Sequence, residues 1–186
     1  MWTYIKWGIR LTVLAVVLAF LHYTLPQRDI VRITGTYNRL TEVGANSIFY
    51  ASPDSGTTTT TVDRRDIRFI EAVFPDGDVM VYRNEDTGWI WPPYFKYDSS
   101  NLQAEAKNLE SGKDNPQWVA VTHYGWRLPI LSIYPNAVKL RPASGPDEMI
   151  IPYFNIIFLT ALVGLGLYVR VKWQRFVARR MGEPAP

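Results

Sequence analysis

The sequence predicts an α+β membrane protein in which two transmembrane helices, at 5–25 and 150–169, flank a mainly β domain with one short helix. Three observations carry this prediction. The 186-residue chain has an apolar segment near each end, a polar middle rich in strand-like patterns, and positive charge concentrated beside the apolar segments. We therefore divide the chain into a short N-terminus (1–4), the first helix, a domain (26–149), the second helix and a basic tail (170–186).

The first apolar segment is long enough to cross a bilayer. Its residues would rise about 31 Å as a helix, against a hydrocarbon core of about 30 Å. Between Leu11 and Leu21 it carries no charge, and aromatic residues lie at both ends, as in membrane-interface belts. A cleaved signal peptide has a similar basic start and apolar core, but no small-x-small cleavage motif follows this segment. We therefore expect an uncleaved anchor.

The second apolar segment carries no formal charge and no polar stripe that would face solvent in a soluble protein. Asn155 is its one strongly polar side chain, and Thr160 and Gly164 lie four residues apart. Small residues at such spacing let helices approach closely, and an amide can hydrogen-bond across a helix interface. We expect Asn155, Thr160 and Gly164 to pack against the first helix. In the alternative interpretation, Asn155 lies in water at headgroup level.

The distribution of charge predicts the orientation. Lys6 and Arg10 precede the domain, five basic residues follow it, and the domain itself has thirteen Lys or Arg against sixteen Asp or Glu. Because basic residues mark the cytoplasmic flanks of transmembrane helices, both termini should be cytoplasmic and the domain extracytoplasmic. A nucleic-acid partner is disfavoured, since it would require positive charge on the folded domain.

The sequence pattern of the middle domain predicts mostly strands. Segments enriched in β-branched and aromatic residues lie at 29–37, 66–74, 78–85, 118–126 and 130–140. The Asp-Gly pair within 75–78 predicts a hairpin turn between the second and third segments. One helix is expected after Ser100, which would cap it with Gln103 as the capping-box partner, and Ser111-Gly112 would end it.

The densest aromatic stretch, 89–98, is the candidate partner or ligand surface. Its aromatic residues are Trp89, Trp91, Tyr94, Phe95 and Tyr97. Aromatic side chains are enriched among the residues that dominate protein interfaces, and such a run can also stack on a sugar or a peptide. In the competing interpretation the segment covers the domain core or lies on the nearby bilayer surface.

His123 is the one candidate catalytic residue, as a general base oriented by Asp86 or Asp98. No nucleophile motif such as G-x-S-x-G accompanies it, and a lone histidine in a strand is usually structural. The lack of cysteine excludes thiolate metal sites and cysteine nucleophiles. We predict no metal site and no cofactor.

Three stretches, 21–36, 79–106 and 121–142, resemble a family of alphaproteobacterial membrane proteins that is defined as a domain of unknown function. The resemblance covers nearly the whole chain. It implies a bacterial inner-membrane protein, so that the domain 26–149 would be periplasmic. It implies no activity, cofactor or catalytic residue.

These observations favour a non-enzymatic envelope protein whose periplasmic interaction domain serves as an accessory or assembly factor of a membrane complex. Its expected partners are the lipid bilayer and a membrane protein, and its oligomeric state is left open. One alternative is a membrane-anchored periplasmic hydrolase or envelope-modifying enzyme that uses His123 with a nearby carboxylate. Another is a periplasmic module that binds a glycan or a small ligand.

Overall fold

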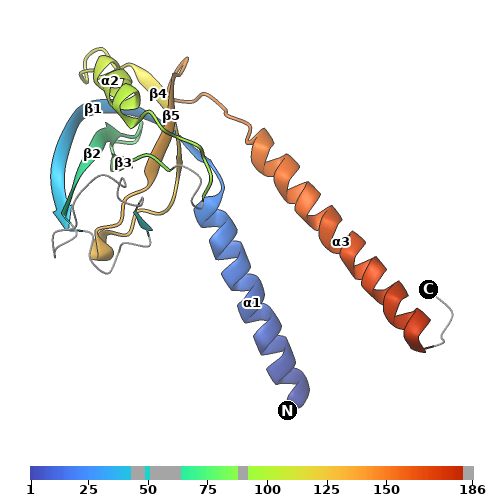
Figure 1. Cartoon of the computed structure of the whole chain (residues 1–186). Coiled ribbons are helices and arrows are strands. Elements are labelled where there is room, and N and C mark those ends of the chain that lie inside the picture. The colour runs from blue at the N-terminus through green and yellow to red at the C-terminus, as the bar shows by residue number, and fades with distance from the viewer. Residues whose placement is uncertain (43–48, 51–63, 88–91, 182–186) are drawn as a thin grey trace. The chain divides into compact units, whose positions relative to one another are not determined.

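The structure is a computed structural model that describes residues 1–42, 49–50, 64–87 and 92–181 (Figure 1). The chain divides into two compact units, Met1–Met149 and Ile150–Pro186. The first unit holds one long helix, one short helix and a five-stranded barrel, and the second holds one long helix. The predicted α+β class is confirmed, with a mixed sheet and a long apolar helix near each end of the chain.

The two long helices are α1 (Trp2–Thr24) and α3 (Tyr153–Met181). Each is long and apolar enough to cross a membrane, with mean hydropathies of 1.8 and 1.9 over an 18-residue window. Neither window is buried inside the protein, whereas the core helix of a soluble protein buries its apolar face. The α3 helix continues well past 169, so most of the basic segment expected as a tail is helical.

The strands, in chain order, are β1 (Gln27–Glu42), β2 (Arg64–Val73), β3 (Val79–Asn84), β4 (Trp118–Tyr124) and β5 (Asn136–Pro142). They close into a barrel in the order β1-β2-β3-β5-β4. All pairs are antiparallel except β3 with β5, and α2 (Ser99–Asn108) connects β3 to β4. A five-stranded barrel with this order, this parallel pair and this helix has the topology of the OB-fold.

The long strand β1 serves both sides of the barrel. Its first part, from Gln27 to Arg32, pairs with β4, and its second part, from Arg32 to Glu42, pairs with β2. A bulge between Ile33 and Gly35 bends the strand between these partners, and Figure 1 shows the resulting curve.

The predicted hairpin turn joins β2 to β3. The Phe74 N–H donates to the Asp78 carbonyl at 2.8 Å, and the Gly77 N–H donates to the Phe74 carbonyl at 3.0 Å. Gly77 has a φ of 97°, a conformation that glycine adopts without steric cost.

The main core fills the barrel, and Figure 1 shows α2 lying across one of its ends. The buried strand residues of this core are Val31, Ile33, Ile70, Ala72, Tyr82, Val119, Val121, Ala137 and Leu140. From α2 and its C-terminal end, Leu102, Ala106 and Leu109 pack onto them. The helix therefore closes the barrel and fixes the segment that leads into it.

A second, smaller cluster covers the outer face of β2 and β3. Its members are Tyr50, Ile67 and Phe69, with Tyr37, Phe49, Val81 and Tyr134 packed against them. In OB-folds this face and the loops after the first and fourth strands commonly bind ligands. Here side chains from both of those loops pack onto the face.

Two local predictions were wrong. Helix α2 begins at Ser99 with Asp98 as its N-cap residue, so Ser100 lies inside the helix, and the Ser99 N–H donates to a carboxylate oxygen of Asp86 at 2.9 Å. The strand expected at 130–140 begins only at Asn136. Before it, Ser132 has a left-handed φ of 52° and Pro135 lacks an N–H, so neither suits a central strand.

Candidate partner-binding surface

Phe95 and Tyr97 project from the segment between β3 and α2. They are 49% and 60% exposed, whereas Lys96 between them is 4% exposed. This alternation leaves two aromatic side chains in contact with water and directs the lysine into the protein. Among the aromatic residues of the candidate surface that the structure describes, Phe95 and Tyr97 are the well-exposed ones.

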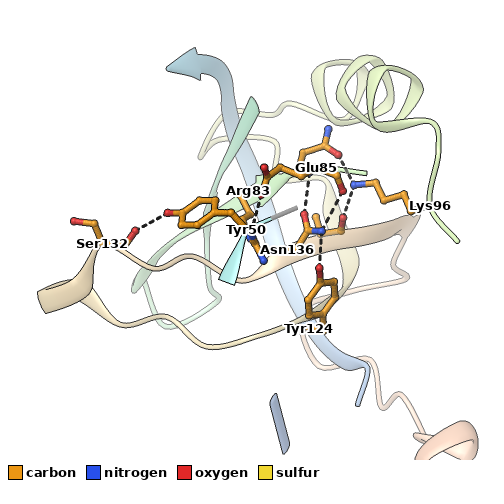
Figure 2. A network of polar contacts seen from close by, with 9 residues as sticks. Tyr50, Arg83, Glu85, Lys96, Tyr124, Ser132 and Asn136 are labelled. Atoms are coloured by element: carbon orange, nitrogen blue, oxygen red, sulfur yellow. Dashed lines mark hydrogen bonds and ion pairs between the residues drawn. The ribbon is translucent and has the colours of Figure 1, made fainter. Parts of the chain in front are cut away.

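The Lys96 ammonium anchors this segment to the barrel, as Figure 2 shows. It donates to the side-chain oxygen of Asn84 and, at 2.6 Å, to the carbonyl of Ala137 on β5. Burial lowers the pKa of Lys96 to about 7, although the negative charges of Asp86 and Asp98 oppose this shift. A neutral amine keeps two N–H donors, which match the two acceptors.

Asn84 extends the anchor to α2 and β2. Its amide nitrogen donates to the Ser99 carbonyl and to the side-chain oxygen of Gln103, both at 2.8 Å. Gln103 in turn donates to the Phe69 carbonyl at 3.1 Å. Gln103 therefore fastens α2 to the barrel, in place of the capping-box role predicted for it.

The backbone at Phe95 is strained. Its φ of 52° is a left-handed conformation, which costs a non-glycine residue about 1–2 kcal/mol. Beside it, the Thr87 N–H donates to the Lys96 carbonyl at 3.0 Å, and the Lys96 N–H donates to the Thr87 hydroxyl at 3.3 Å. These bonds and the buried lysine hold the strained residue in place.

Tyr94 contributes mainly to the junction between the barrel and α1. Its hydroxyl donates to the Thr24 carbonyl at 2.7 Å, and its ring stacks on Tyr124 with centroids 4.9 Å apart. Burial raises the pKa of Tyr94. Trp89 and Trp91 lie outside the described residues, so their place in the candidate surface stays a prediction.

A second buried polar group lies next to the lysine and centres on Arg83 (Figure 2). Arg83 is 1% exposed, pairs with Glu85 at 2.6 Å, and places its guanidinium carbon 4.8 Å from the centre of the Tyr50 ring. Asn136 exchanges hydrogen bonds of 3.0 and 3.1 Å with the Glu85 backbone and donates to the Tyr124 hydroxyl at 3.2 Å. This group joins the ends of β3, β4 and β5.

His123 lies inside the barrel, on β4. Its Nε2 is 2.9 Å from a carboxylate oxygen of Asp29, which also accepts a hydrogen bond of 2.6 Å from Tyr82. The neighbouring carboxylate is therefore Asp29, not Asp86 or Asp98 as predicted. Burial alone would raise the pKa of Asp29, but its contacts with His123 and Tyr82 hold it below the usual value. Since His123 is 4% exposed, a substrate does not reach it in this structure.

The three residues proposed for helix packing all lie on α3. The Thr160 hydroxyl donates to the Ile156 carbonyl of its own helix at 2.8 Å. A Cβ added at Gly164 would meet no described atom within 4 Å. Because α3 is a unit by itself, the packing of Asn155, Thr160 and Gly164 against the first helix stays a prediction.

Within the described ranges, no group of three or more His, Cys, Asp or Glu side chains is placed to hold a metal ion. The residues that sequence reasoning missed are those that anchor the surface: Arg83, Asn84, Lys96 and Asn136. The sequence does contain one hint, because Lys96 is the single lysine within the aromatic stretch. Its burial, however, depends on acceptors that β3 and β5 supply once they lie side by side.

The topology and the two apolar helices define a class of protein in which an OB-fold barrel lies between two candidate membrane spans. The chain belongs to the DUF1523 family, described as a protein of unknown function, whose model matches residues 3–177. An "Uncharacterized protein" of Haemophilus influenzae is 36% identical over 156 residues, which cover 82% of this chain and 83% of that relative. No solved structure matches the chain. Membership of a family of unknown function is confirmed, and the restriction to alphaproteobacteria stays a prediction.

Proposed function

We propose that this protein is a non-enzymatic, membrane-anchored interaction module and an accessory or assembly factor of a membrane complex. In this proposal Phe95 and Tyr97 dock a membrane-protein partner. The observation that carries it is the alternation at 95–97, where two well-exposed aromatic residues flank a lysine that is 4% exposed. A buried lysine and a left-handed phenylalanine both reduce stability, and such local strain tends to collect at functional sites.

The surface is also rigid in a way that suits binding. Lys96 bonds to β3 and β5 on its inner side, and Thr87 pairs with its backbone. A surface that is ordered before binding loses less conformational entropy when a partner docks. Aromatic anchors on a fixed backbone are the residues that most often dominate an interface.

We place the barrel in the periplasm of a bacterium, with both termini in the cytoplasm and α1 and α3 spanning the inner membrane. The support is the positive charge at the end of each helix that is nearer to its chain terminus, since basic residues mark the cytoplasmic flanks of membrane helices. Alkaline phosphatase, which is active only in the periplasm, reports this orientation. Fusion after Gly145 should give active enzyme, and fusion at the C-terminus should not. The reverse result would contradict the topology.

The hydrolase alternative receives less support. His123 does contact the carboxylate of Asp29, whose side chain is 24% exposed, but His123 itself is 4% exposed and Tyr82 is fully buried. A general base must come within hydrogen-bond reach of the proton that it abstracts from the substrate. The Asp29–His123–Tyr82 group is better explained as a polar part of the barrel core.

The docking proposal is tested by co-purification from native membranes in mild detergent, with chemical crosslinking and mass spectrometry. The wild type is compared with the double variant Phe95→Ala/Tyr97→Ala. The control is Val79→Ala, since Val79 is 74% exposed on β3. We expect one stoichiometric partner with the wild type and the control, and its loss with the double variant at unchanged expression. The same partner recovered by the double variant would contradict the docking site, and a wild type that emerges alone would contradict the accessory role.

A further inference from the structure

The loop between β4 and β5 is clamped to the last turn of α1. The Gly125 N–H donates to the Tyr23 carbonyl at 2.9 Å, and the Trp126 indole donates to His22 Nδ1 at 2.9 Å. The rings of Tyr23 and Trp126 meet edge to face, with centroids 5.3 Å apart. Gly125 has a φ of 92°, a left-handed conformation that glycine adopts without steric cost, and a Cβ there would lie in ordinary contact, 3.5 Å from the Tyr23 ring.

The loop leaves the barrel on the side where α1 attaches. Strand β4 runs toward α1, because His123 pairs with Gln27, the first residue of β1, while Trp118 pairs with Arg32. The loop therefore continues past the start of β1, toward the helix. The β2–β3 turn lies at the other end, since Val73 pairs with Arg32 and with Val79. The start of the β4–β5 loop, beside Gln27, and the β2–β3 turn, beside Arg32, are therefore five strand residues apart, or about 17 Å.

The tip of the loop is ordered and apolar. A short 3-10 helix at Pro129–Leu131 forms the tip, and Leu128 and Ile133 bridge below it. Arg127 stiffens the base, because it donates to the Ile133 carbonyl at 3.1 Å and its guanidinium lies 4.1 Å from the centre of the Tyr134 ring. On this base Ile130 is 97% exposed and Leu131 is 48% exposed.

The level of the tip relative to a bilayer follows from α1. The 23 residues of α1 extend about 34 Å, so a helix that crosses a core of about 30 Å ends with its last turn at the far interface. His22, Tyr23 and Trp126 meet at that turn, and Tyr and Trp favour the interface. Ile130 follows Gly125 by five residues, a reach of at most about 18 Å.

We propose that the Pro129–Leu131 tip inserts Ile130 and Leu131 into the lipid interface in which α1 ends, and so gives the barrel a second contact with the bilayer. The inference rests on the proposed membrane anchoring and does not depend on the identity of the protein partner. An exposed isoleucine alone is ordinary on a protein surface. Here, however, two adjacent aliphatic residues lie on an ordered tip, on the side of the barrel that faces the membrane anchor. The contact would fix how the barrel tilts on the membrane, and with it the direction in which Phe95 and Tyr97 point.

The lack of cysteine in the chain allows a direct test. Single variants Ile130→Cys, Val79→Cys and Leu14→Cys of the full chain carry a nitroxide spin label and are reconstituted in phosphatidylcholine–phosphatidylglycerol vesicles. The collision rates of the label with oxygen, which concentrates in lipid, and with a water-soluble nickel chelate report its depth. Position 79 reports the far end of the barrel, and position 14 reports the middle of α1. Residues 79 and 14 are 74% and 53% exposed, so a label is tolerated at both.

We expect the ratio of oxygen to nickel collisions at position 130 to exceed that at position 79 severalfold and to approach that at position 14. Equal ratios at 130 and 79, with a high ratio at 14, would overturn the inference while leaving the anchoring intact. A low ratio at 14 would overturn both. Low collision rates with both reagents at 130 would also overturn it, because they indicate burial against another copy of the protein.

Discussion

Replacement of Lys96 by methionine should remove a specific pH dependence of stability. In the folded protein the pKa of Lys96 is about 7, against 10.5 for an ordinary lysine. Between these values the unfolded chain binds a proton that the folded protein has released. Raising the pH through this window therefore stabilises the folded state, and below pH 7 the full cost of charging the buried amine is present.

The magnitude follows from the two pKa values. At pH 7 the folded lysine is half protonated, and at pH 9 it is almost wholly neutral, whereas the unfolded lysine stays mostly charged at both. Each pKa unit corresponds to about 1.4 kcal/mol, so Lys96 alone should raise the free energy of unfolding by about 2 kcal/mol between pH 7 and pH 9. The absolute stability of Lys96→Met is less informative, because the variant relieves the burial of charge but leaves the oxygens of Asn84 and Ala137 without this donor.

The assay is urea unfolding of the full chain in detergent micelles, followed by near-ultraviolet circular dichroism at pH 7, 8 and 9. The wild type should gain about 2 kcal/mol across this range, and Lys96→Met should gain little. Lys113→Met is the matched control, because it removes the same charge from an exposed position. If Lys96→Met keeps the full rise, the lysine is not buried as described and the account of the anchor is wrong.

Three further predictions concern the supports of the barrel. Asp29→Asn should cost about 1–3 kcal/mol at pH 7, because Asp29 accepts a hydrogen bond from Tyr82 and contacts His123. Since the folded pKa of Asp29 is lowered, its contribution is fully present above about pH 4 and is lost as the pH falls through the folded pKa, so the difference in unfolding free energy between variant and wild type should shrink steadily as a urea-unfolding series is carried further into acid. Ser132→Gly should raise the free energy of unfolding by about 0.5–1 kcal/mol, measured by urea unfolding, because glycine adopts the left-handed conformation without strain. The variant also keeps the backbone carbonyl that accepts a hydrogen bond from the Tyr50 hydroxyl. Tyr94→Phe should cost about 1 kcal/mol through loss of its bond to the helix end, and an unchanged midpoint would contradict that bond.

Local patterns in the sequence predicted much of the fold. The two long apolar segments predicted both long helices, alternation predicted the strands, and Asp-Gly predicted the turn at 75–78. The barrel itself was not predicted, because its closure depends on β1 pairing with both β2 and β4 and on the parallel contact between Arg83 and Asn136. These contacts join residues far apart in the sequence, and no local pattern specifies them.

The candidate site shows the same division. Composition indicated that 89–98 is an unusual aromatic stretch, but it did not separate Tyr94, which holds α1, from Phe95 and Tyr97, which are exposed. That separation depends on the left-handed backbone at Phe95 and on the acceptors that Asn84 and Ala137 supply to the intervening lysine. A phenylalanine in this conformation has no sequence signal, because the cost is borne by contacts formed elsewhere in the fold.

The central claim is that Phe95 and Tyr97 contact a membrane protein, and site-specific photo-crosslinking tests it most directly. A photoreactive benzoylphenylalanine replaces Phe95 in one strain and Val79 in another, and intact cells are irradiated before the protein is purified. The account predicts one dominant adduct with a membrane protein from position 95 and none from position 79. No adduct from position 95, or the same adducts from both positions, would contradict it.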